Sequence, residues 1–376
     1  MEKFLALPDA DRKTAFQEAA SRRDVLPIIV EKDFWVCWTL KQLYSIPALG
    51  PHITFKGGTS LSKAFGLIER FSEDIDLTIS KAVLDIAKSK KAVLDIAKSK
   101  DPMEENISGK ELERRLGELK AHAQSFVAET ILPKLHDKFS NVLGTGTDWK
   151  LELDNEDKDQ QTILFFYPKI LEYNQVIKTP TLKTKAGTWK IITTVDTTVA
   201  FEGYIKPAIR LEFGARGDII PSTSRHITSY IAETFPQLFQ DAICAVPTLD
   251  TERTFWEKAT ILHAIHHGSK LRDRMSRHYY DTYILAIKAV ADLAIKNVPL
   301  LEQVVLNKSI FFKDNKASYE TAKIGSLKLL PPDSLLDGLR KDYDAMHEMF
   351  IGEVPEFEVI IATLTELENK INNLSS

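Results

Sequence analysis

The feature that most constrains this chain is a pair of aspartates one residue apart, Asp74 and Asp76, in the run RFSEDIDL at 70–77. The apolar residues that alternate with them predict a β-strand, in which successive side chains point to opposite faces. Both carboxylates would then share one face, while Ile75 and Leu77 point into a core. Two carboxylates a pleat apart repel each other unless a cation lies between them, so the pair indicates a Mg²⁺ site. A solvated strand edge is the alternative interpretation.

A diglycine bend precedes this strand, at Gly57 and Gly58 in the run FKGGTSLSKAFG at 55–66. Glycine adopts backbone angles closed to other residues and lets backbone N–H groups approach a ligand closely. Thr59 or Ser60 would begin a helix, and a helix N-terminus favours phosphate. Phosphate donors beside a carboxylate pair indicate a nucleoside triphosphate (NTP) carried as its Mg²⁺ complex. The bend is not a Walker A loop, because no Gly-Lys-Ser/Thr ends it.

Together, the runs GGTS at 57–60 and RFSEDIDL at 70–77 resemble the signature of the AbiEii/AbiGii toxin family. That family is part of the DNA polymerase β-like nucleotidyltransferase superfamily, and the resemblance spans about residues 30–285. It implies an α/β (α+β) nucleotidyltransferase fold with a mixed sheet and N-terminal helices over 1–225. A C-terminal helical bundle over 226–376 would close the other side of a nucleotide cleft.

The superfamily signature includes a third carboxylate, on a strand beside the aspartate pair. The resemblance assigns that place to Glu212, in the alternating run AIRLEFG at 208–214, although many relatives carry Asp there. An ion pair of Glu212 with Arg210 or Arg216 is the alternative role. The residues that the resemblance makes both catalytic and metal-binding are Asp74, Asp76 and Glu212.

The resemblance also implies residues around this centre. Lys32 and Asp33 lie in the run EKDFW at 31–35, which matches a family motif, so they would face the active site; alternatively, Glu31 and Asp33 simply favour the positive end of a helix. Asp281, in a second motif, would orient Arg277 or Lys258, or support a helix contact. A solvated position is the competing interpretation for each cation, above all for Lys63. The residues expected to bind the nucleotide are Gly57, Gly58, Thr59, Ser60, Lys63, Arg70, Lys206, Lys258 and Arg277.

Histidines and basic residues gather after residue 262. Their helical spacing would allow a zinc site, but no cysteine lies near and no His-Glu-x-x-His motif is present. The basic residues would contact phosphate or form a charged loop between helices. The histidines are His263, His266, His267 and His278, and the basic residues are Lys270, Arg272, Arg274 and Arg277.

The length of the chain and its residue pattern predict its domain number, its location and its secondary structure. The chain has 376 residues, enough for two domains, with a net charge of −4 and two cysteines far apart. No signal peptide and no run of about twenty apolar residues is present, so a cytoplasmic protein without a membrane span is expected. Residues 81–90 and 91–100 are identical, which we interpret as a tolerated insertion or an artefact. Helices are expected near 9–21, 31–44, 109–137 and 251–267, and strands near 149–153, 162–167 and 189–192.

The resemblance implies a nucleotidyltransferase that uses Mg²⁺ or Mn²⁺ to transfer a nucleoside monophosphate from an NTP to an acceptor, releasing pyrophosphate. It further implies the toxin of a bacterial toxin–antitoxin pair, active in abortive infection and phage defence, with RNA, especially tRNA, as acceptor and a cognate antitoxin as partner. Two alternatives stay open. One is a nucleotide-binding regulatory module without transfer activity, and the other is phosphoryl transfer to a protein.

Overall fold

The fold is organised around one mixed β-sheet of seven strands, in the order β3-β4-β5-β2-β1-β7-β6. The computed structural model describes residues 1–72, 74–84, 101–104, 106–146, 148–172, 206–240, 243–268 and 270–374. The β2–β5 and β1–β7 pairs are parallel and the others antiparallel, which confirms the predicted mixed sheet. The strands are β1 (Ile53–Lys56), β2 (Asp74–Ile79), β3 (Lys150–Leu153), β4 (Thr162–Phe166), β5 (Ile209–Gly214), β6 (Ser222–Ile227) and β7 (Cys244–Leu249).

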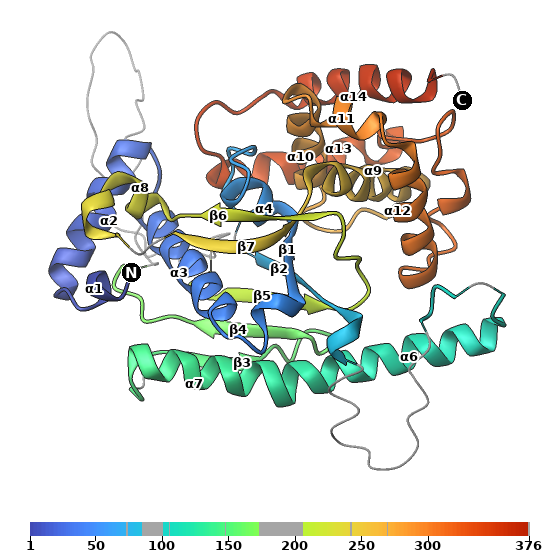
Figure 1. Cartoon of the computed structure of the whole chain (residues 1–376). Helices are drawn as coiled ribbons and strands as arrows, with labels where there is room; N and C mark the ends of the chain where they lie inside the picture. The colour runs from blue at the N-terminus through green and yellow to red at the C-terminus, as the bar shows by residue number, and fades with distance from the viewer. Residues whose placement is uncertain are drawn as a thin grey trace, which may run out of the picture.

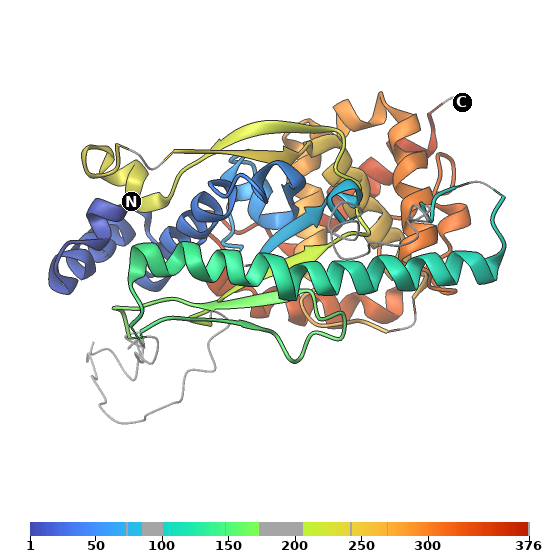
Figure 2. The same ribbon diagram turned by 60° about the horizontal axis from the view of Figure 1, so that its bottom comes forward.

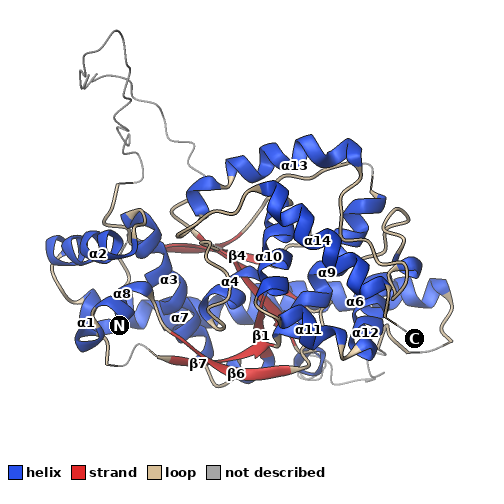
Figure 3. Cartoon of the chain, turned by 90° about the horizontal axis from the view of Figure 1, so that it is seen from above, coloured by secondary structure: helices blue, strands red, loops and turns tan. Residues whose placement is uncertain are grey.

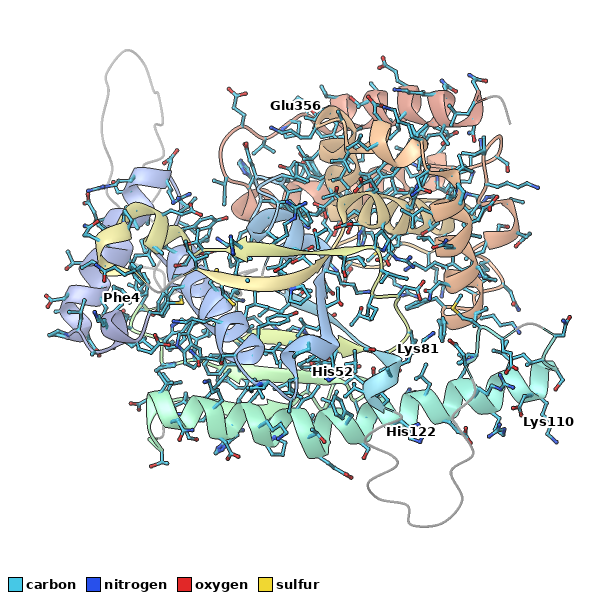
Figure 4. All side chains as sticks on the ribbon, viewed as in Figure 1. Phe4, His52, Lys81, Lys110, His122 and Glu356 are labelled. Carbon is cyan, nitrogen blue, oxygen red and sulfur yellow. The ribbon has the colours of Figure 1, made fainter. Side chains whose placement is uncertain are left out.

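Helices cover one face of this sheet with a large aromatic core (Figure 1). Trp38 of α3 and Phe139 of α7 pack edge to face on each other at 4.7 Å between ring centroids, and Phe139 lies 4.8 Å from Phe165 of β4. Phe4, labelled in Figure 4, extends this core toward the N-terminus by packing on Phe16. The elements on this side are α1 (Glu2–Leu5), α2 (Asp9–Arg23), α3 (Pro27–Tyr44), η1 (Gly50–His52), α6 (Gly109–Phe126), α7 (Leu132–Leu143), α8 (Tyr230–Thr234) and η3 (Pro236–Leu238).

The long helix predicted over 109–137 is present, with one irregularity. A π-helical segment, η2 (Val127–Ile131), joins α6 to α7, and Figure 2 shows the three as one rod in front of the sheet. Pro133 in the first turn of α7 has no N–H to donate to the preceding turn, which accounts for the widened turn before it.

The C-terminal part of the chain is helical and has a core of its own, built on residues such as Trp256, Tyr279 and Leu364. Figure 3 shows these helices grouped at one end of the sheet, and Leu61 and Ile68 from the first part of the chain belong to their core. The elements are α9 (Thr251–His267), α10 (Ser276–Ile287), α11 (Val290–Ile295), α12 (Val298–Phe311), η4 (Tyr319–Thr321), α13 (Asp333–Ala345), η5 (His347–Met349) and α14 (Phe357–Asn372).

The predicted boundary at 225/226 needs a correction, because it falls inside β6. β6 and β7 complete the sheet, and β7 pairs with β1 through Phe55 and Thr248, so the sheet runs to Leu249. Pro247 lies within β7, where it pairs opposite Ser224 of the edge strand.

Two further expectations lie outside the described residues: the strand at 189–192, and the duplicated insertion from residue 85 onward. Within the described ranges, none of the helices combines the length and the apolar character that a membrane span requires.

Candidate active site

Three carboxylates meet on one face of the sheet. Ile75 and Leu77 of β2 are buried in the core on the opposite face, so Asp74 and Asp76 share the other face, as the alternation predicted. β5 runs parallel to β2, and its register sets Glu212 directly opposite Asp76. The structure therefore brings together the three acids that are distant in the sequence.

Arg210 supplies positive charge beside these acids. On β5 it lies opposite Asp74, and its Nε is 3.3 Å from Glu212 Oε1 and 3.9 Å from Asp74 Oδ1. Its Nη1 is 2.6 Å from Asp154 Oδ2. The expected alternative, an ion pair between Arg210 and Glu212, is thus present beside the carboxylate cluster, whereas Arg216 pairs with Asp159 instead.

Negative charge is nevertheless concentrated here. Burial raises the pKa of Glu212 to about 7, and repulsion from Asp76 and Asp74 adds to this effect while Arg210 opposes it. Carboxylate oxygens are the donors that Mg²⁺ prefers, so the chemistry of this set fits a hard divalent cation. As placed, however, no group of three or more His, Cys, Asp or Glu in the described part of the chain surrounds a point where a metal could sit. Metal binding would require the carboxylates to turn from Arg210 toward a shared cation.

The diglycine bend lies against Asp76. Gly57 has a φ of +79°, and a Cβ on it would lie 1.9 Å from Asp76 Oδ2, so only glycine fits there. A Cβ on Gly58 would lie 2.7 Å from Arg70 Nη2. The bend therefore lets a backbone turn, a carboxylate and a guanidinium share a space that side chains would fill.

The helix after the bend, α4 (Gly57–Lys63), begins at Gly57 and not at Thr59 or Ser60 as predicted. Both hydroxyl groups are buried and used within the protein: Thr59 Oγ1 donates to the carbonyl oxygens of Ser72 and Asp74, and Ser60 Oγ donates to Gly57 O at 2.8 Å. These hydroxyls therefore have partners within the protein, and their contact with phosphate stays a prediction.

A buried ion-pair cluster joins the bend to the C-terminal helices. Arg70 donates from Nε and Nη2 to the two Asp281 oxygens at 2.7 and 2.8 Å, and Lys258 Nζ donates to Asp281 Oδ2 at 2.7 Å. Burial acts to raise the pKa of Asp281, but the charges of Arg70 and Lys258 outweigh it and hold the pKa below its usual range. Asp281 thus orients Lys258, as one interpretation predicted, and also Arg70, which none did.

Lys63 and Asp33 are not in the cleft, contrary to the expectation for both. Lys63 Nζ lies 2.7 Å from Asp33 Oδ1 and 3.8 Å from the centre of the Tyr230 ring, and Asp33 Oδ2 also accepts from Tyr230 N at 2.6 Å. Burial alone would lower the pKa of Lys63, but Asp33 raises it, so the ammonium stays charged. The pair fastens α4 to α3 and α8. Because α3 begins at Pro27, Asp33 also lies beyond the first turn, which removes the helix-end alternative.

Lys32 and Lys206 do lie beside the carboxylates. They line a pocket of about 610 Å³ together with Asp74, and Lys32 Nζ donates to Lys206 O at 2.7 Å. Arg277 approaches from α10, with Nη1 3.8 Å from Asp74 Oδ2. Sequence reasoning predicted the strands at 149–153 and 162–167 but did not include Glu152, Asp154 or Phe166 in the site, although all three line this pocket. Arg274 lines it too, and was expected only as one of the basic residues that would contact phosphate.

The histidines of α9 form hydrogen bonds within the protein. His263 Nε2 lies 3.0 Å from Ser318 O, and its Nδ1 accepts from Lys328 N at 3.0 Å, so both ring nitrogens are used. His266 Nδ1 lies 2.7 Å from Leu330 O. These contacts fix the histidines to the segments on either side of η4, and they favour packing over the zinc alternative.

Comparison with known proteins identifies a family. The family model described as nucleotidyl transferase AbiEii toxin, type IV toxin–antitoxin system, matches residues 38–363. No curated protein matches the chain. Among solved structures, the chain is similar to JHP933 from Helicobacter pylori (12% identity over 93% of each chain, TM-score 0.40). It is also similar to MenT4, a nucleotidyltransferase toxin from Mycobacterium tuberculosis (14% identity, 99% of this chain and 100% of that chain, TM-score 0.39).

Proposed function

Because the chain belongs to the AbiEii family of nucleotidyltransferase toxins, we propose that it transfers a nucleoside monophosphate from a Mg²⁺-bound NTP to an RNA acceptor, in particular tRNA. The observation that carries this proposal is the register of β2 and β5, which sets Glu212 opposite Asp76 beside Asp74. Such a cluster next to a diglycine bend suits charged phosphates and a metal better than it suits stability, because its acids repel one another.

Asp74, Asp76 and Glu212 are the residues that would hold the metal. When bound, a divalent cation supplies charge neutralisation for the phosphates and activation of the attacking hydroxyl. The acceptor hydroxyl oxygen forms a bond to the α-phosphorus, the bond from that phosphorus to its bridging oxygen breaks, pyrophosphate leaves, and the hydroxyl proton passes to water. The residues of the chain orient the reacting groups: backbone groups of Gly57 and Gly58 would lie beside the phosphates, and Arg277 lies beside Asp74.

The acceptor and the partner are proposed from the family and from local charge. The net charge of −4 offers no general attraction for nucleic acid, but Lys206 and Arg274 give the pocket beside Asp74 a basic wall. As a member of a type IV toxin–antitoxin family, the chain would be countered by a cognate antitoxin in the cytoplasm.

Label transfer tests this function. The protein is incubated with Mg²⁺, total tRNA and an NTP labelled at the α- or the γ-phosphate. We expect the α-label alone to reach the RNA, and we expect an Asp74→Asn/Asp76→Asn double variant to lose at least about 100-fold in rate, as when charged transition-state contacts are removed. EDTA stops the reaction, and Mg²⁺ or Mn²⁺ restores it. Asp137→Asn, on the exposed surface of α7, is the matched control and keeps full activity.

Each other outcome has a distinct meaning. Transfer of the γ-label would establish the phosphoryl-transfer alternative. Binding of NTP without transfer to RNA, or to any component of a lysate, would establish the regulatory module. Equal transfer by the wild type and the double variant would remove the carboxylate cluster from the mechanism.

A further inference from the structure

The pocket beside Asp74 extends away from the diglycine bend. Cross-strand register forms a continuous row on the carboxylate face, from Asp74 through Arg210 and Leu164 to Glu152 on the edge strand β3. Phe166 lies two residues beyond Leu164 on the same face. Strand spacing and rise place its Cα about 12 Å from that of Asp74. The bend follows β1, on the other side of β2, so the carboxylates lie between the bend and this pocket.

Phe166 is unusual for its position. Its neighbours in sequence, Phe165 on β4 and Tyr167 just after the strand, are buried in the aromatic core, whereas Phe166 keeps 36% of its surface exposed and lines the pocket. An exposed phenyl ring on a strand face is a platform on which a base can stack, whatever its identity.

Arg274 supplies charge to the same pocket from a constrained backbone. It has a φ of +62°, rare for a residue other than glycine, and Asp342 fixes this turn by accepting from the backbone N–H groups of Arg274 and Ser276, each at 2.7 Å. The turn places the Arg274 side chain in the lining of the pocket, to which Lys206 also belongs. The lining holds four acids as well: Asp154 pairs with Arg210 and Glu152 with Lys150, which partly neutralises these two carboxylates, and Asp74 and Glu156 are the others.

We propose that this pocket holds the 3′-terminal nucleotide of an acceptor RNA, with its base stacked on Phe166 and its phosphate near Arg274 and Lys206. The proposal rests on the proposed function, since an in-line displacement requires the attacking hydroxyl and the leaving pyrophosphate on opposite sides of the α-phosphorus. With the NTP phosphates at the diglycine bend, the acceptor must approach from the side of β5, β4 and β3. A protein acceptor has no planar base to place on Phe166.

Binding of a defined RNA tests the proposal without any transfer. The probe is a fluorescein-labelled single-stranded RNA of about twelve nucleotides, compared with the same RNA lacking the base of its 3′-terminal residue. Fluorescence anisotropy is measured for the wild type, Phe166→Ala, Phe166→Trp and Phe312→Ala. Phe312, 38% exposed on the C-terminal part, is the control of matched exposure.

We expect Phe166→Ala to weaken binding of the intact RNA by about 5- to 100-fold, the range for one stacked base, while Phe166→Trp and Phe312→Ala bind as the wild type does. Removing the terminal base should weaken binding to the wild type by a similar factor and leave binding to Phe166→Ala unchanged.

Equal binding by the wild type and Phe166→Ala would overturn the proposal. So would equal loss in both proteins when the base is removed, or a wild type that binds neither RNA. These failures are distinct from failure of the proposed function: label transfer to a protein would keep the transferase and refute the RNA pocket. If the protein binds the intact RNA more tightly than the RNA without its terminal base but transfers no label, the RNA pocket is kept and the transferase is refuted.

Discussion

At the scale of single residues, the site depends on the absence of a side chain at position 57. Gly57 combines a positive φ with a close approach to the Asp76 carboxylate, so its lack of a side chain serves both the turn and the carboxylate. Other glycines differ in this respect: a Cβ added to Gly117 on α6 would meet nothing within 4 Å.

We expect Gly57→Ala to abolish transfer activity while the protein stays folded. The new methyl group must displace the Asp76 carboxylate, and the left-handed backbone adds about 1–2 kcal/mol of strain. Activity and the midpoint of thermal unfolding are measured together. Gly117→Ala is the matched control and should keep activity with equal or higher stability, because alanine suits a helix interior. Normal activity of Gly57→Ala would show that Asp76 need not stay where the structure has it.

At the scale of elements, helix α3 carries a buried glutamate, Glu31, that lies outside the proposed active site. Glu31 is fully buried and accepts from Ile170 N at 2.7 Å, which ties α3 to the segment after β4. Burial raises the pKa of Glu31 to about 7, and the hydrogen bond from Ile170 only partly opposes this. Between about pH 4.5 and 7 the folded chain therefore keeps a proton that the unfolded chain has lost.

This excess of bound protons in the folded state makes the free energy of unfolding fall as the pH rises through that window and level off above pH 7. Glu31→Gln cannot titrate. We expect its stability relative to the wild type to increase by up to about 3 kcal/mol between pH 5 and pH 8, measured by urea denaturation. Glu18→Gln, at an exposed pair with Arg22, should show no such trend. A difference between Glu31→Gln and wild type that is the same at both pH values would contradict the buried titration.

The elements also show what the sequence could predict. Local signals sufficed for β2, whose alternation put Asp74 and Asp76 on one face, and for α9, which ends at His267 as expected. β7 was missed because Pro247 is a signal against strands, and pairing with β6 and with the distant Phe55 outweighs it. Local patterns carry no information about such long-range pairs.

The same reason explains the errors in the site. Lys63 was assigned to phosphate because it follows the bend closely, but its charge is satisfied by Asp33 across the fold. Arg70 was expected to bind the nucleotide because it directly precedes the carboxylate strand, and its partner Asp281, 211 residues away, was not foreseen. Glu212 was reached only through the family resemblance, because its own strand gives no sign of which strand lies beside it.

At the scale of the whole molecule, Asp281 joins the two cores. It is fully buried and neutralises Arg70 from the sheet side and Lys258 from the helical side. Removing its charge would take from two buried cations the carboxylate that they share, which is far more costly than losing an exposed pair.

We therefore expect Asp281→Asn to lower the free energy of unfolding by about 3–5 kcal/mol. Asp292→Asn, which breaks the exposed pair with Lys370, should lower it by less than about 1 kcal/mol. Both values come from denaturant titration followed by tryptophan fluorescence. Similar small losses in the two variants would show that Arg70 and Lys258 find other partners and that Asp281 does not hold the cores together.

The long separation of Arg70 from Asp281 bears on how the toxin is made. A growing polypeptide exposes the diglycine bend early, but the carboxylate that neutralises Arg70 emerges from the ribosome only 211 residues later. Arg277, which contacts Asp74, emerges just before it. A translation product that ends before α10 therefore lacks both Asp281 and Arg277. The set of charges around the bend and Asp74 is complete only once synthesis has passed α10.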